Sequence, residues 1–496
     1  MTATKGRSTI LLVYPGKKTA GREQIVPLSV MALVNPLKMA GFRPVVFDER
    51  VDGDFRPVFE SVRDDLLFVG ISTLTGTTIT YGLSTARKVR DADSTLPLVW
   101  GGVHPTLIPD QTLENPYVDI VVRGEGEETV VALAQALRDG QNLGQVDGIS
   151  YKEDGRLTNN APRKYTEFDS LPPVTYDMLD PSKYLVDQYI SYQSSRGCPF
   201  QCTFCDVRAF HSRRQRFKRV ETVLDDLEHI VERFHPETIE FIDDCFLTNL
   251  KRGEGIMRGL IERGIKFKWL CTCRADFFRR MSDDYLKLMK ESGCCEVYVG
   301  IESGSQHMLD ALHKGITVEQ TYKAAERLVA TGIRMSCNFV SGFPNETPED
   351  FQQSIEMHRK LTQFCDDPAK LYIGGILLYA PYPGTEEYEK VVKLGFRPPQ
   401  NLEAWGRFVL NDRSNTTWHP RKHIDRILTI AQITRGGVQP FPLRRIAKAA
   451  IKGPRSRFPY YVLKTIACYR WKYRFFRFPL DVRLLGLVRK WTFGFG

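Results

Sequence analysis

The chain has 496 residues, 42% of them hydrophobic and 26% charged, which is the composition of an ordinary globular protein and excludes an intrinsically disordered one. At roughly 100–200 residues per domain, this length predicts about two to four domains. No run of about 18 uncharged apolar residues occurs, so we expect no transmembrane helix. The apolar stretch near the N-terminus is too short for a secretory signal and leads directly into a predicted strand, which indicates a cytoplasmic protein.

The charge is unevenly distributed along the chain. The formal net charge is +10, but residues 440–496 alone contain fourteen Lys and Arg and one acidic residue, Asp481. The other 439 residues carry 55 Lys and Arg against 58 Asp and Glu. The body of the chain is therefore near neutral, and the basicity belongs to its C-terminal segment.

The first part of the chain alternates apolar strands with helices. Strands are predicted at 8–14, 44–49, 66–73, 96–102 and 118–124, and helices at about 27–40, 81–90 and 127–139. Continuous apolar strands that alternate with helices are typical of a parallel sheet covered on both faces. We therefore expect residues 1–145 to form an α/β domain with a doubly wound, Rossmann-like sheet of the flavodoxin type.

Gly-rich or polar segments follow these strands: "YPGKKTAG", "STLTGTT", "GGVHPT" and "RGEGEET". Ligands of such sheets bind beyond the carboxyl ends of the strands. Small residues let a bulky ligand approach the backbone, and hydroxyl groups can bond its polar rim. Glycine at strand ends is equally typical of ordinary turns, so this pattern alone leaves both interpretations open.

A second alternating series follows a linker. Residues 146–187 are predicted to contain a β-hairpin that turns at Asp154-Gly155 and then a linker rich in Pro and Asp. Strands are then predicted at 189–195, 238–244, 267–273, 295–303, 334–343 and 370–379, with helices between them. Six such units indicate a partial or complete (β/α)6 barrel over 188–385, with its active site at the C-terminal ends of the strands. Residues 386–496 are expected to be mostly helical.

Three cysteines, Cys198, Cys202 and Cys205, follow the first strand of this second series. Thiolates are ligands for zinc or for iron–sulfur clusters. A closed zinc site would need a fourth ligand, for which His211 is a candidate. A [4Fe–4S] cluster held by three cysteines instead leaves one iron open for an external ligand. Four other cysteines lie on apolar, strand-like segments and are expected to be free buried thiols: Cys271, Cys273, Cys294 and Cys295.

The cluster sequence "RGCPFQCTFC", with an aromatic residue before its last cysteine, resembles that of the radical S-adenosylmethionine enzymes. "GIESGSQ" at 300–306, "FVSGFPNET" at 339–347 and "PYPGTEEY" at 381–388 are also similar to motifs of that family, and the likeness extends over about 190–385. It implies that the three cysteines hold a [4Fe–4S] cluster whose open iron binds S-adenosylmethionine, which is cleaved to a 5′-deoxyadenosyl radical. It also implies that six residues contact S-adenosylmethionine: Phe204, Arg274, Glu302, Ser303, Asn338 and Gly342.

The domain before the barrel resembles the cobalamin-binding domain of the cobalamin-dependent radical enzymes, so that the likeness covers about 8–390. It implies cobalamin contacts from Ser72, Thr73, Leu74, Thr75, Gly101, Gly102, His104, Gly124, Glu125 and Gly126. One feature departs from the methionine-synthase type of cobalamin domain, because its Asp-x-His-x-x-Gly motif is absent. We therefore expect no histidine below the cobalt, and we expect His104, which Pro105 follows, to be a loop residue near the corrin.

The roles of several other polar residues stay open at this stage, and no catalytic residue is assigned. Asp243 and Asp244 end the second barrel strand, where they would either position substrate or a proton or support the loop to Asn249. The basic run at 208–219 is expected to form a solvated loop or to supply positive charge near S-adenosylmethionine.

The C-terminal segment 440–496 interleaves Tyr, Trp and Phe with Arg and Lys. Aromatic residues favour the bilayer interface and cations are attracted to anionic headgroups, so peripheral contact with the inner membrane face is one interpretation. A helical cap on the barrel is the other. An RNA-binding patch has a similar composition, but no RNA-recognition module accompanies it, so no nucleic acid is expected.

The resemblance implies a cobalamin-dependent methyltransferase that acts on an unactivated carbon of a lipophilic substrate such as a tetrapyrrole, a hopanoid or another isoprenoid. One S-adenosylmethionine would supply the methyl group through cobalamin and a second would supply the radical. Electrons would come from a flavodoxin- or ferredoxin-type donor. Two alternatives remain: an oxidative cyclase of the anaerobic magnesium-protoporphyrin monomethyl ester type, and a non-catalytic cobalamin-binding sensor.

Overall fold

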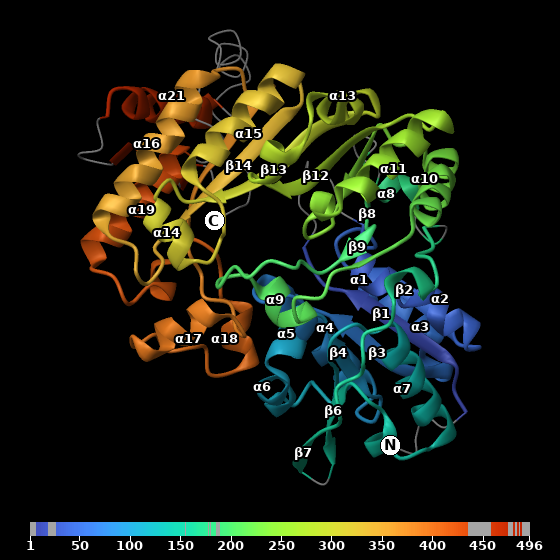
Figure 1. The fold of residues 1–496 in the computed structure, drawn as a ribbon. Coiled ribbons are helices and arrows are strands. Elements are labelled where there is room, and N and C mark those ends of the chain that lie inside the picture. The colour runs from blue at the N-terminus through green and yellow to red at the C-terminus, as the bar shows by residue number, and fades with distance from the viewer. Residues whose placement is uncertain are drawn as a thin grey trace.

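The computed structural model describes most of the chain as two parallel sheets with their helices (Figure 1). The described residues are 6–17, 26–434 except 154, 177, 179 and 185–188, then 458–474 and 480, 481, 484, 485, 487 and 488. Much of the basic segment 440–496 therefore lies outside the described residues.

The first sheet has the strand order β2-β1-β3-β4-β5-β6-β7, and its first five strands are parallel. These five strands are β1 (Thr9–Tyr14), β2 (Arg43–Asp48), β3 (Leu66–Ser72), β4 (Leu98–Gly101) and β5 (Ile120–Val122). The order 2-1-3-4-5 is that of a flavodoxin-like sheet. The predicted doubly wound domain is thereby confirmed.

Helices cover both faces of this sheet, because its strands are apolar on both sides. Ile10 and Leu12 of β1 pack toward one cluster of buried side chains, and Leu11 and Val13 toward the other. The helices of this part are α1 (Leu28–Met31), α2 (Val34–Met39), α3 (Phe55–Val62), α4 (Thr77–Ala92), α5 (Val103–Leu107), α6 (Pro109–Glu114) and α7 (Glu127–Asp139).

The helix predicted at about 27–40 is divided into α1 and α2. Pro36 lies in the first turn of α2, where it has no N–H to donate to the carbonyl of Ala32, and its ring disfavours a continuous helix through that turn. The two short helices are the result.

The predicted hairpin belongs to the first sheet. Its strands β6 (Ile149–Glu153) and β7 (Arg156–Asn159) are antiparallel and extend the sheet beyond β5. The chain then runs back along the molecule toward α8 (Pro181–Tyr184), where the Tyr184 hydroxyl donates to Asp48 at 3.0 Å. The segment after the hairpin therefore packs against the carboxyl end of β2.

The second sheet has the order β15-β14-β13-β12-β11-β8, and all its neighbouring strands are parallel. Its strands are β8 (Tyr189–Tyr192), β11 (Thr238–Phe241), β12 (Lys268–Arg274), β13 (Cys294–Glu302), β14 (Arg334–Ser341) and β15 (Leu371–Leu378). The helices between them are α10 (Val220–Phe234), α11 (Leu250–Glu262), α12 (Phe277–Arg280), α13 (Asp283–Glu291), α14 (Gln306–Ala311), α15 (Val318–Thr331) and α16 (Pro348–Phe364). The sheet is curved and open at its two edges, which confirms the partial (β/α)6 barrel.

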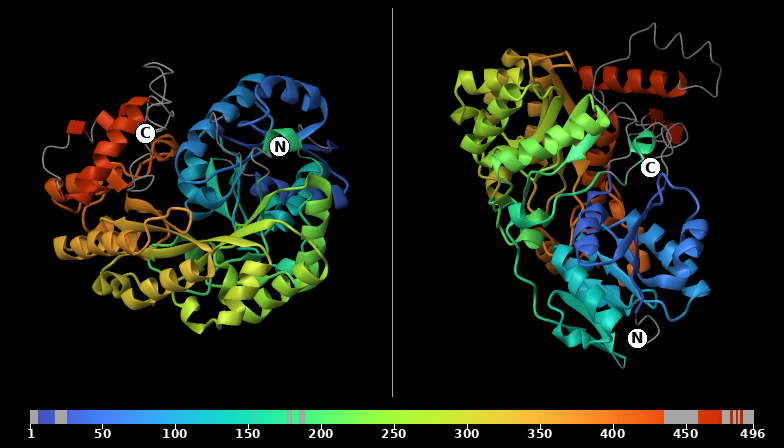
Figure 2. Two further views of the ribbon diagram at one scale, coloured as in Figure 1. Left: turned by 90° about the horizontal axis from the view of Figure 1, so that it is seen from above. Right: turned by 90° about the vertical axis from the view of Figure 1, so that its right-hand side faces the viewer.

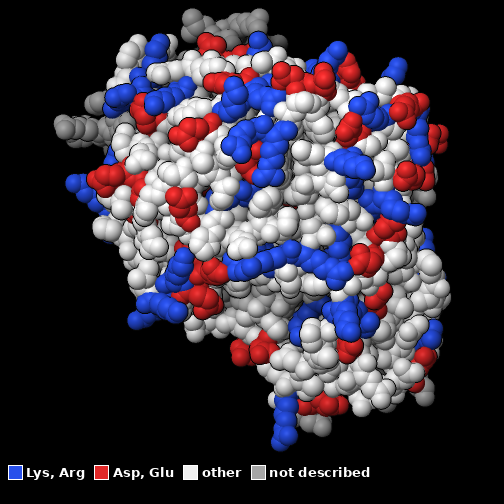
Figure 3. Space-filling view, in the orientation of Figure 1, with Lys and Arg blue, Asp and Glu red and all other residues white. Residues whose placement is uncertain are grey.

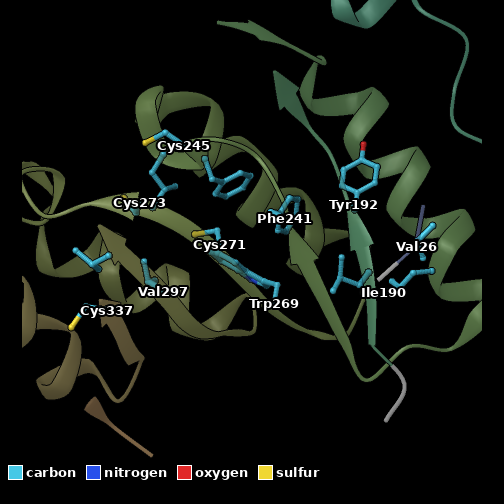
Figure 4. Close-up of a cluster of buried hydrophobic side chains, with 14 of the residues drawn as sticks. Val26, Ile190, Tyr192, Phe241, Cys245, Trp269, Cys271, Cys273, Val297 and Cys337 are labelled. Carbon is cyan, nitrogen blue, oxygen red and sulfur yellow. The ribbon is translucent and has the colours of Figure 1, made fainter. Parts of the chain in front are cut away.

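The outer face of the barrel is a closed apolar core, and its thiols lie inside that core (Figure 4). Cys271 and Cys273 of β12 are at most 1% exposed, and Cys294 and Cys337 are also buried. All eleven cysteines are free, as the sequence predicts for the isolated ones. Burial raises the pKa of Cys271 and Cys273 well above the ordinary value, so these thiols are neutral packing groups.

The inner, concave face of the barrel is more polar and partly exposed. Thr272, Tyr298 and Ser336 are register partners on β12, β13 and β14, so they share this face. Tyr298 is 38% exposed. Figure 2, seen from above, shows the outer helices on one side of the curved sheet and the N-terminal domain on the other. The uncovered face of the barrel thus faces the first sheet.

The C-terminal helices join the two sheets. They are α17 (Glu386–Lys393), α18 (Leu402–Gly406), α19 (Arg421–Thr434) and α21 (Phe458–Lys472). The indole of Trp405 donates to Gln111 at 2.6 Å, so α18 is fixed to the N-terminal domain. Lys464 of α21 is buried and donates to the carbonyl of Ile433. Among the described residues, no helix is long and apolar enough to cross a membrane.

Candidate active site

The three cysteines lie on a loop between the two sheets, here called the cluster loop (residues 197–215). The loop begins and ends at a short antiparallel pair of strands, β9 (Ser195–Arg196) and β10 (Arg216–Phe217), and carries α9 (Asp206–His211). Figure 1 shows β9 and α9 between the barrel and the N-terminal domain. The cysteines therefore follow the first barrel strand at its carboxyl end, as the sequence predicts.

The thiols of this loop suit a cluster better than a single ion. Within the part of the chain that the structure describes, no three His, Cys, Asp or Glu side chains are arranged to hold one metal ion. His211, the alternative zinc ligand, has its Nδ1 atom 3.3 Å from Oε1 of Glu125. Three soft sulfur ligands on one loop fit a [4Fe–4S] cluster with one open iron.

Burial controls the charge of these thiols. It raises the pKa of Cys198, and it raises that of Cys205 to about 12, with a further increase from the nearby charge of Asp206. Both sulfurs are therefore protonated until a metal displaces the protons, which makes loading of the site dependent on pH.

Two buried cations flank the cluster loop. The guanidinium of Arg274 lies 3.7 Å from the ring centroid of Phe200 in the loop and donates to Asp276 at 3.0 Å. Nζ of Lys314 donates to Glu302 at 2.7 Å and lies 5.9 Å from the ring of Phe204. Each cation is paired with a carboxylate, so the cluster loop is flanked by two buried ion pairs. Lys314 was not predicted from the sequence, although it follows "LDALH" soon after the "GIESGSQ" motif.

The structure brings some of the predicted S-adenosylmethionine residues together. Glu302 ends β13 with a φ of +59°, a strained backbone conformation that aims its side chain toward Lys314. Asn338 is exposed on the concave face, and Phe204 packs against Phe343 with ring centroids 5.5 Å apart. Ser303 is different, because its buried hydroxyl lies 3.1 Å from that of Ser354 and shapes the turn after β13.

The loop after β14 contains a further buried acid. The amide of Gly342, which has a φ of +94°, donates to Glu346. Burial raises the pKa of Glu346 to about 8 against the lowering effect of this hydrogen bond. Glu346 stands in the quoted "FVSGFPNET" motif but was not singled out from the sequence, because its burial is a tertiary effect.

The two carboxylates at the end of β11 have structural roles. Asp243 accepts hydrogen bonds from the amide and hydroxyl of Ser194 and from the hydroxyl of Ser195. Asp244 accepts from the amide of Gly197 at 2.8 Å. Both side chains fix the start of the cluster loop, so their role here is structural, but they hold a different segment from the predicted loop to Asn249.

Seven of the ten predicted cobalamin residues line one cavity of about 390 Å³ at the carboxyl ends of the first sheet: Ser72, Leu74, Gly101, Gly102, Gly124, Glu125 and Gly126. Leu12, Phe68 and Val99 form apolar walls that the sequence analysis did not name. A mostly apolar cavity with a few polar groups is typical of a cofactor site.

Glycines line this cavity, and two of them pack too closely against their neighbours to carry a side chain. A Cβ atom on Gly102 would lie 2.5 Å from the carbonyl oxygen of Thr73, and a Cβ on Gly70 would lie 3.1 Å from Leu12. Gly102 also has a φ of +100°. The residues present therefore fit a large ring that approaches the backbone at the strand ends.

The remaining three predicted residues do not line the cavity. His104 lies in helix α5, 1% exposed, so the prediction of a loop residue was wrong. Its Nδ1 lies 3.0 Å from the hydroxyl of Thr75, and its ring lies 5.4 Å from that of Trp405. Burial lowers the pKa of His104 to about 4. Thr73 is buried beside them at 1% exposure. The short helix forms because the chain turns at Gly102 and packs under α18.

The opposite wall of the cavity comes from the barrel. Gln193, Arg196, Phe210, His211 and Ile242 line it together with the strand ends of the first sheet. The cluster loop therefore roofs the cavity in the N-terminal domain. Sequence analysis missed these residues, although Arg196 stands two positions before the first cysteine.

The basic run at 208–219 is mostly a set of solvated ion pairs. Arg208 pairs with Glu386, and Arg214 with Glu167, both near the surface. Figure 3 shows a band of basic side chains across this face at the level of the cluster loop. Arg214 agrees with the predicted solvated loop, whereas Arg208 lies in helix α9 and Arg216 is buried.

Two family models match this chain, and together they define its class. The Radical SAM superfamily model matches residues 192–358, and the B12 binding domain model matches residues 22–134. The chain belongs to the radical SAM superfamily, in the branch that carries a B12-binding domain. It is an enzyme whose cofactors are a [4Fe–4S] cluster, S-adenosylmethionine and cobalamin.

Individual relatives agree with this assignment. An uncharacterized methyltransferase of Pyrococcus horikoshii is 33% identical over 393 residues, which cover 77% of this chain and 83% of the relative. The anaerobic magnesium-protoporphyrin IX monomethyl ester cyclase of Rubrivivax gelatinosus is 26% identical over 77% of this chain and 70% of its own length. The hopanoid C-3 methylase of Methylococcus capsulatus is 25% identical over 74% and 68%.

Solved structures share the fold. The cobalamin-dependent S-adenosylmethionine radical enzyme OxsB, with aqua-cobalamin and S-adenosylmethionine bound, superposes with a TM-score of 0.73 at 19% identity, over 98% of this chain and 75% of that one. The radical methyltransferase TsrM from Kitasatospora setae superposes with a TM-score of 0.66 at 15% identity, over 94% of this chain and all of that one. At these identities the likeness shows the shared architecture.

Proposed function

We propose that this enzyme transfers a methyl group to an unactivated carbon of a lipophilic small molecule. The observation that carries the proposal is the position of the cluster loop, whose Arg196, Phe210 and His211 roof the cavity of the B12-binding domain. A substrate on the concave face of the barrel then lies between the two cofactor sites. One carbon atom is thus within reach of both hydrogen abstraction and methyl delivery.

The proposed reaction balances with two molecules of S-adenosylmethionine. Together with two electrons and the substrate C–H group, they give the methylated product, S-adenosylhomocysteine, methionine and 5′-deoxyadenosine. The electrons require a one-electron donor, for which we propose a flavodoxin- or ferredoxin-type carrier. The protein's own contribution is orientation: Thr272 and Tyr298 offer hydroxyl groups to the polar part of a substrate on the concave face.

Relatives support the lipophilic substrate class. Hopanoid methylases are 25–26% identical to this chain, and the relative with 33% identity is also named a methyltransferase. A second candidate is oxidative ring closure, which is favoured by the cyclase of Rubrivivax gelatinosus at 26% identity over 399 residues.

Product analysis separates these two reactions. The protein is reconstituted anaerobically with cluster and cobalamin, reduced, and supplied with S-adenosylmethionine carrying a labelled methyl group and with a hopanoid or a magnesium-protoporphyrin ester. We expect one labelled methyl group in the product and 5′-deoxyadenosine in solution. Ring oxidation without label would support the cyclase, and failure to form 5′-deoxyadenosine under any condition would refute both.

We also propose peripheral contact with the inner membrane face through the C-terminal segment. Among its described residues, Tyr473, Leu480 and Leu487 are 69%, 69% and 66% exposed. Replacing Tyr473 and Leu480 with Ser should reduce sedimentation with anionic liposomes several-fold, because apolar burial and cation attraction together hold such segments at a bilayer. Equal binding of the wild type and the double variant would contradict the proposal.

A further inference from the structure

Both ends of the cluster loop hold the same carboxylate of the B12-binding domain. Arg196 of β9 stands opposite Arg216 of β10, and both guanidinium groups pair with Glu125, which follows β5. Nη1 of Arg216 donates to Glu125 at 2.9 Å, and Nη2 of Arg196 lies 2.6 Å from Glu127, at the start of α7. The loop that carries the cysteines is thus fixed at its base to the domain beneath it.

A third group from the same loop reaches this carboxylate. His211, at the end of α9, has its Nδ1 atom 3.3 Å from Glu125. Burial alone would raise the pKa of Glu125, but contact with His211, hydrogen bonds from Arg216 and the charge of Arg196 lower it to about 2. The side chains of Glu125 and Arg216 are only 11% and 2% exposed, so their charge pairing is weakly screened by solvent.

The start of the loop is also fixed to the barrel, through the chain neighbours of Arg196. Asp243 holds Ser194 and Ser195, and Asp244 holds the amide of Gly197. The base of the loop therefore has anchors to both domains. The aspartates determine where it leaves the barrel, and Glu125 determines how it sits over the cobalamin cavity.

We propose that Glu125 is a positioning residue that fixes the distance between the cobalamin cavity and the iron–sulfur cluster. Removing its charge would leave Arg196 and Arg216 buried without their main partner, and the base of the loop would shift or fluctuate. A misplacement of about 1 Å can cost roughly 100-fold in a reaction that needs two groups at one atom. This inference concerns the geometry between the cofactors and holds for methyl transfer and ring closure alike.

The test is the magnetic coupling between the two cofactors. Reduced [4Fe–4S] clusters and the Co(II) form of cobalamin are both paramagnetic, and their dipolar coupling falls with the cube of the distance between them. We compare the electron paramagnetic resonance spectra of the wild type and Glu125→Gln, each loaded with both cofactors and reduced. We expect the wild type to show one defined coupling, and Glu125→Gln to lose it in favour of a broadened line.

Two controls define the outcome. Asp119→Asn removes an acid that pairs with Arg90 at 2.6 Å within the same domain and away from the cavity, so its coupling should equal that of the wild type. Glu125→Asp keeps the charge on a shorter side chain and should shift the coupling without broadening it to the same degree. If Glu125→Gln does not fold, the coupling is measured in Glu125→Asp instead.

Loading measurements separate this inference from the function itself. Iron content and formation of 5′-deoxyadenosine should stay near wild-type values in Glu125→Gln, since the three cysteines are intact. Cobalamin content is measured alongside, because Glu125 lines the cavity. An unchanged dipolar spectrum in the fully loaded variants would overturn the proposal. Loss of cobalamin alone would also overturn it, because Glu125 would then be a direct cofactor contact.

Discussion

The two parallel sheets of this enzyme differ in what covers their faces. In the first sheet, β1 and β3 are buried over nearly every residue, because helices lie on both sides. In the second, β13 alternates between buried and open positions, because helices cover only the outer side. The alternation leaves Tyr298 and Asn338 accessible on the concave face.

This difference determines where each sheet can bind a ligand. A sheet buried on both faces offers only the ends of its strands, and there glycines open a cavity. A curved sheet with one uncovered face offers that face as well as its strand ends. The first sheet would therefore hold a large ring at its strand ends, and the second would hold a cluster at its rim with a substrate on its concave face.

The largest expected effect tests whether the two sites are loaded independently. Replacing Cys198, Cys202 and Cys205 together with Ala should abolish the iron–sulfur cluster and the formation of 5′-deoxyadenosine, because the cluster would lose all three of its thiolate ligands. Cobalamin should still bind to the first sheet. Iron analysis, absorption spectra and chromatography of the products measure the three quantities.

A matched variant controls for the loss of a thiol. Cys365 is a free, partly buried cysteine outside the cluster loop, and Cys365→Ala should keep both cofactors. If the triple variant also lost cobalamin, the two sheets would not bind their cofactors independently.

The next effect concerns the glycines of the first sheet. Gly102→Ala should lower the free energy of unfolding by about 3 kcal/mol or more, since it combines backbone strain with a clash. Its φ is +100° and the new Cβ would meet the Thr73 carbonyl at 2.5 Å. Gly101→Ala is the control, because its Cβ would lie 3.6 Å from the nearest atom, an ordinary contact. The free energies of unfolding of the two variants, measured with urea, should differ clearly. Equal values would show that the close contact between Gly102 and Thr73 is not needed for stability.

A helix beside each sheet also contains a buried histidine, which makes the free energy of unfolding depend on pH. Burial lowers the pKa of His104 to about 4 and that of His358 to about 3, against 6.5 in the unfolded chain. Below pH 6.5 the unfolded chain binds protons that the folded chain does not, so stability falls as pH decreases toward these values. At pH 5 each histidine should cost about 2 kcal/mol relative to pH 7.

Substitution tests this pH dependence. Urea unfolding at pH 7 and pH 5 should show that His104→Gln loses about 2 kcal/mol less stability on acidification than the wild type, and that the double variant with His358→Gln loses about 4 kcal/mol less. His358 packs between Phe339 and Trp471, with ring centroids 5.7 and 4.7 Å away. If both variants lose as much stability between pH 7 and pH 5 as the wild type does, the burial of these rings is contradicted.

Much of this architecture follows from sequence because its causes are local. The apolar strands, the glycine-rich strand ends and the three cysteines are each visible within about ten residues. The cluster site and most of the cobalamin cavity were predicted on that basis and on the resemblance that the motifs carry. The break after α1 was missed, although Pro36 explains it through its lack of an N–H.

The residues that were missed depend on tertiary contacts. Glu125 and Arg216 are 91 positions apart, and no local pattern pairs them. His104 was predicted in a loop because the contact that buries it comes from Trp405, about 300 positions later. Asp243 and Asp244 were undecided for the same reason, since their partners lie on another strand end.

The smallest expected effect concerns two rows of side chains that run across the concave face of the barrel. Asn338 lies one row nearer the strand ends than Thr272, because Gly300 pairs with Asn338 while Tyr298 pairs with Thr272. If the upper row binds S-adenosylmethionine, Asn338→Ala should raise its KM about tenfold, the value of roughly one hydrogen bond. Thr272→Val should leave that KM unchanged, since the deeper row faces substrate. Formation of 5′-deoxyadenosine at varied S-adenosylmethionine concentrations measures both, and an equal rise in the two variants would show that the rows do not divide the face between cofactor and substrate.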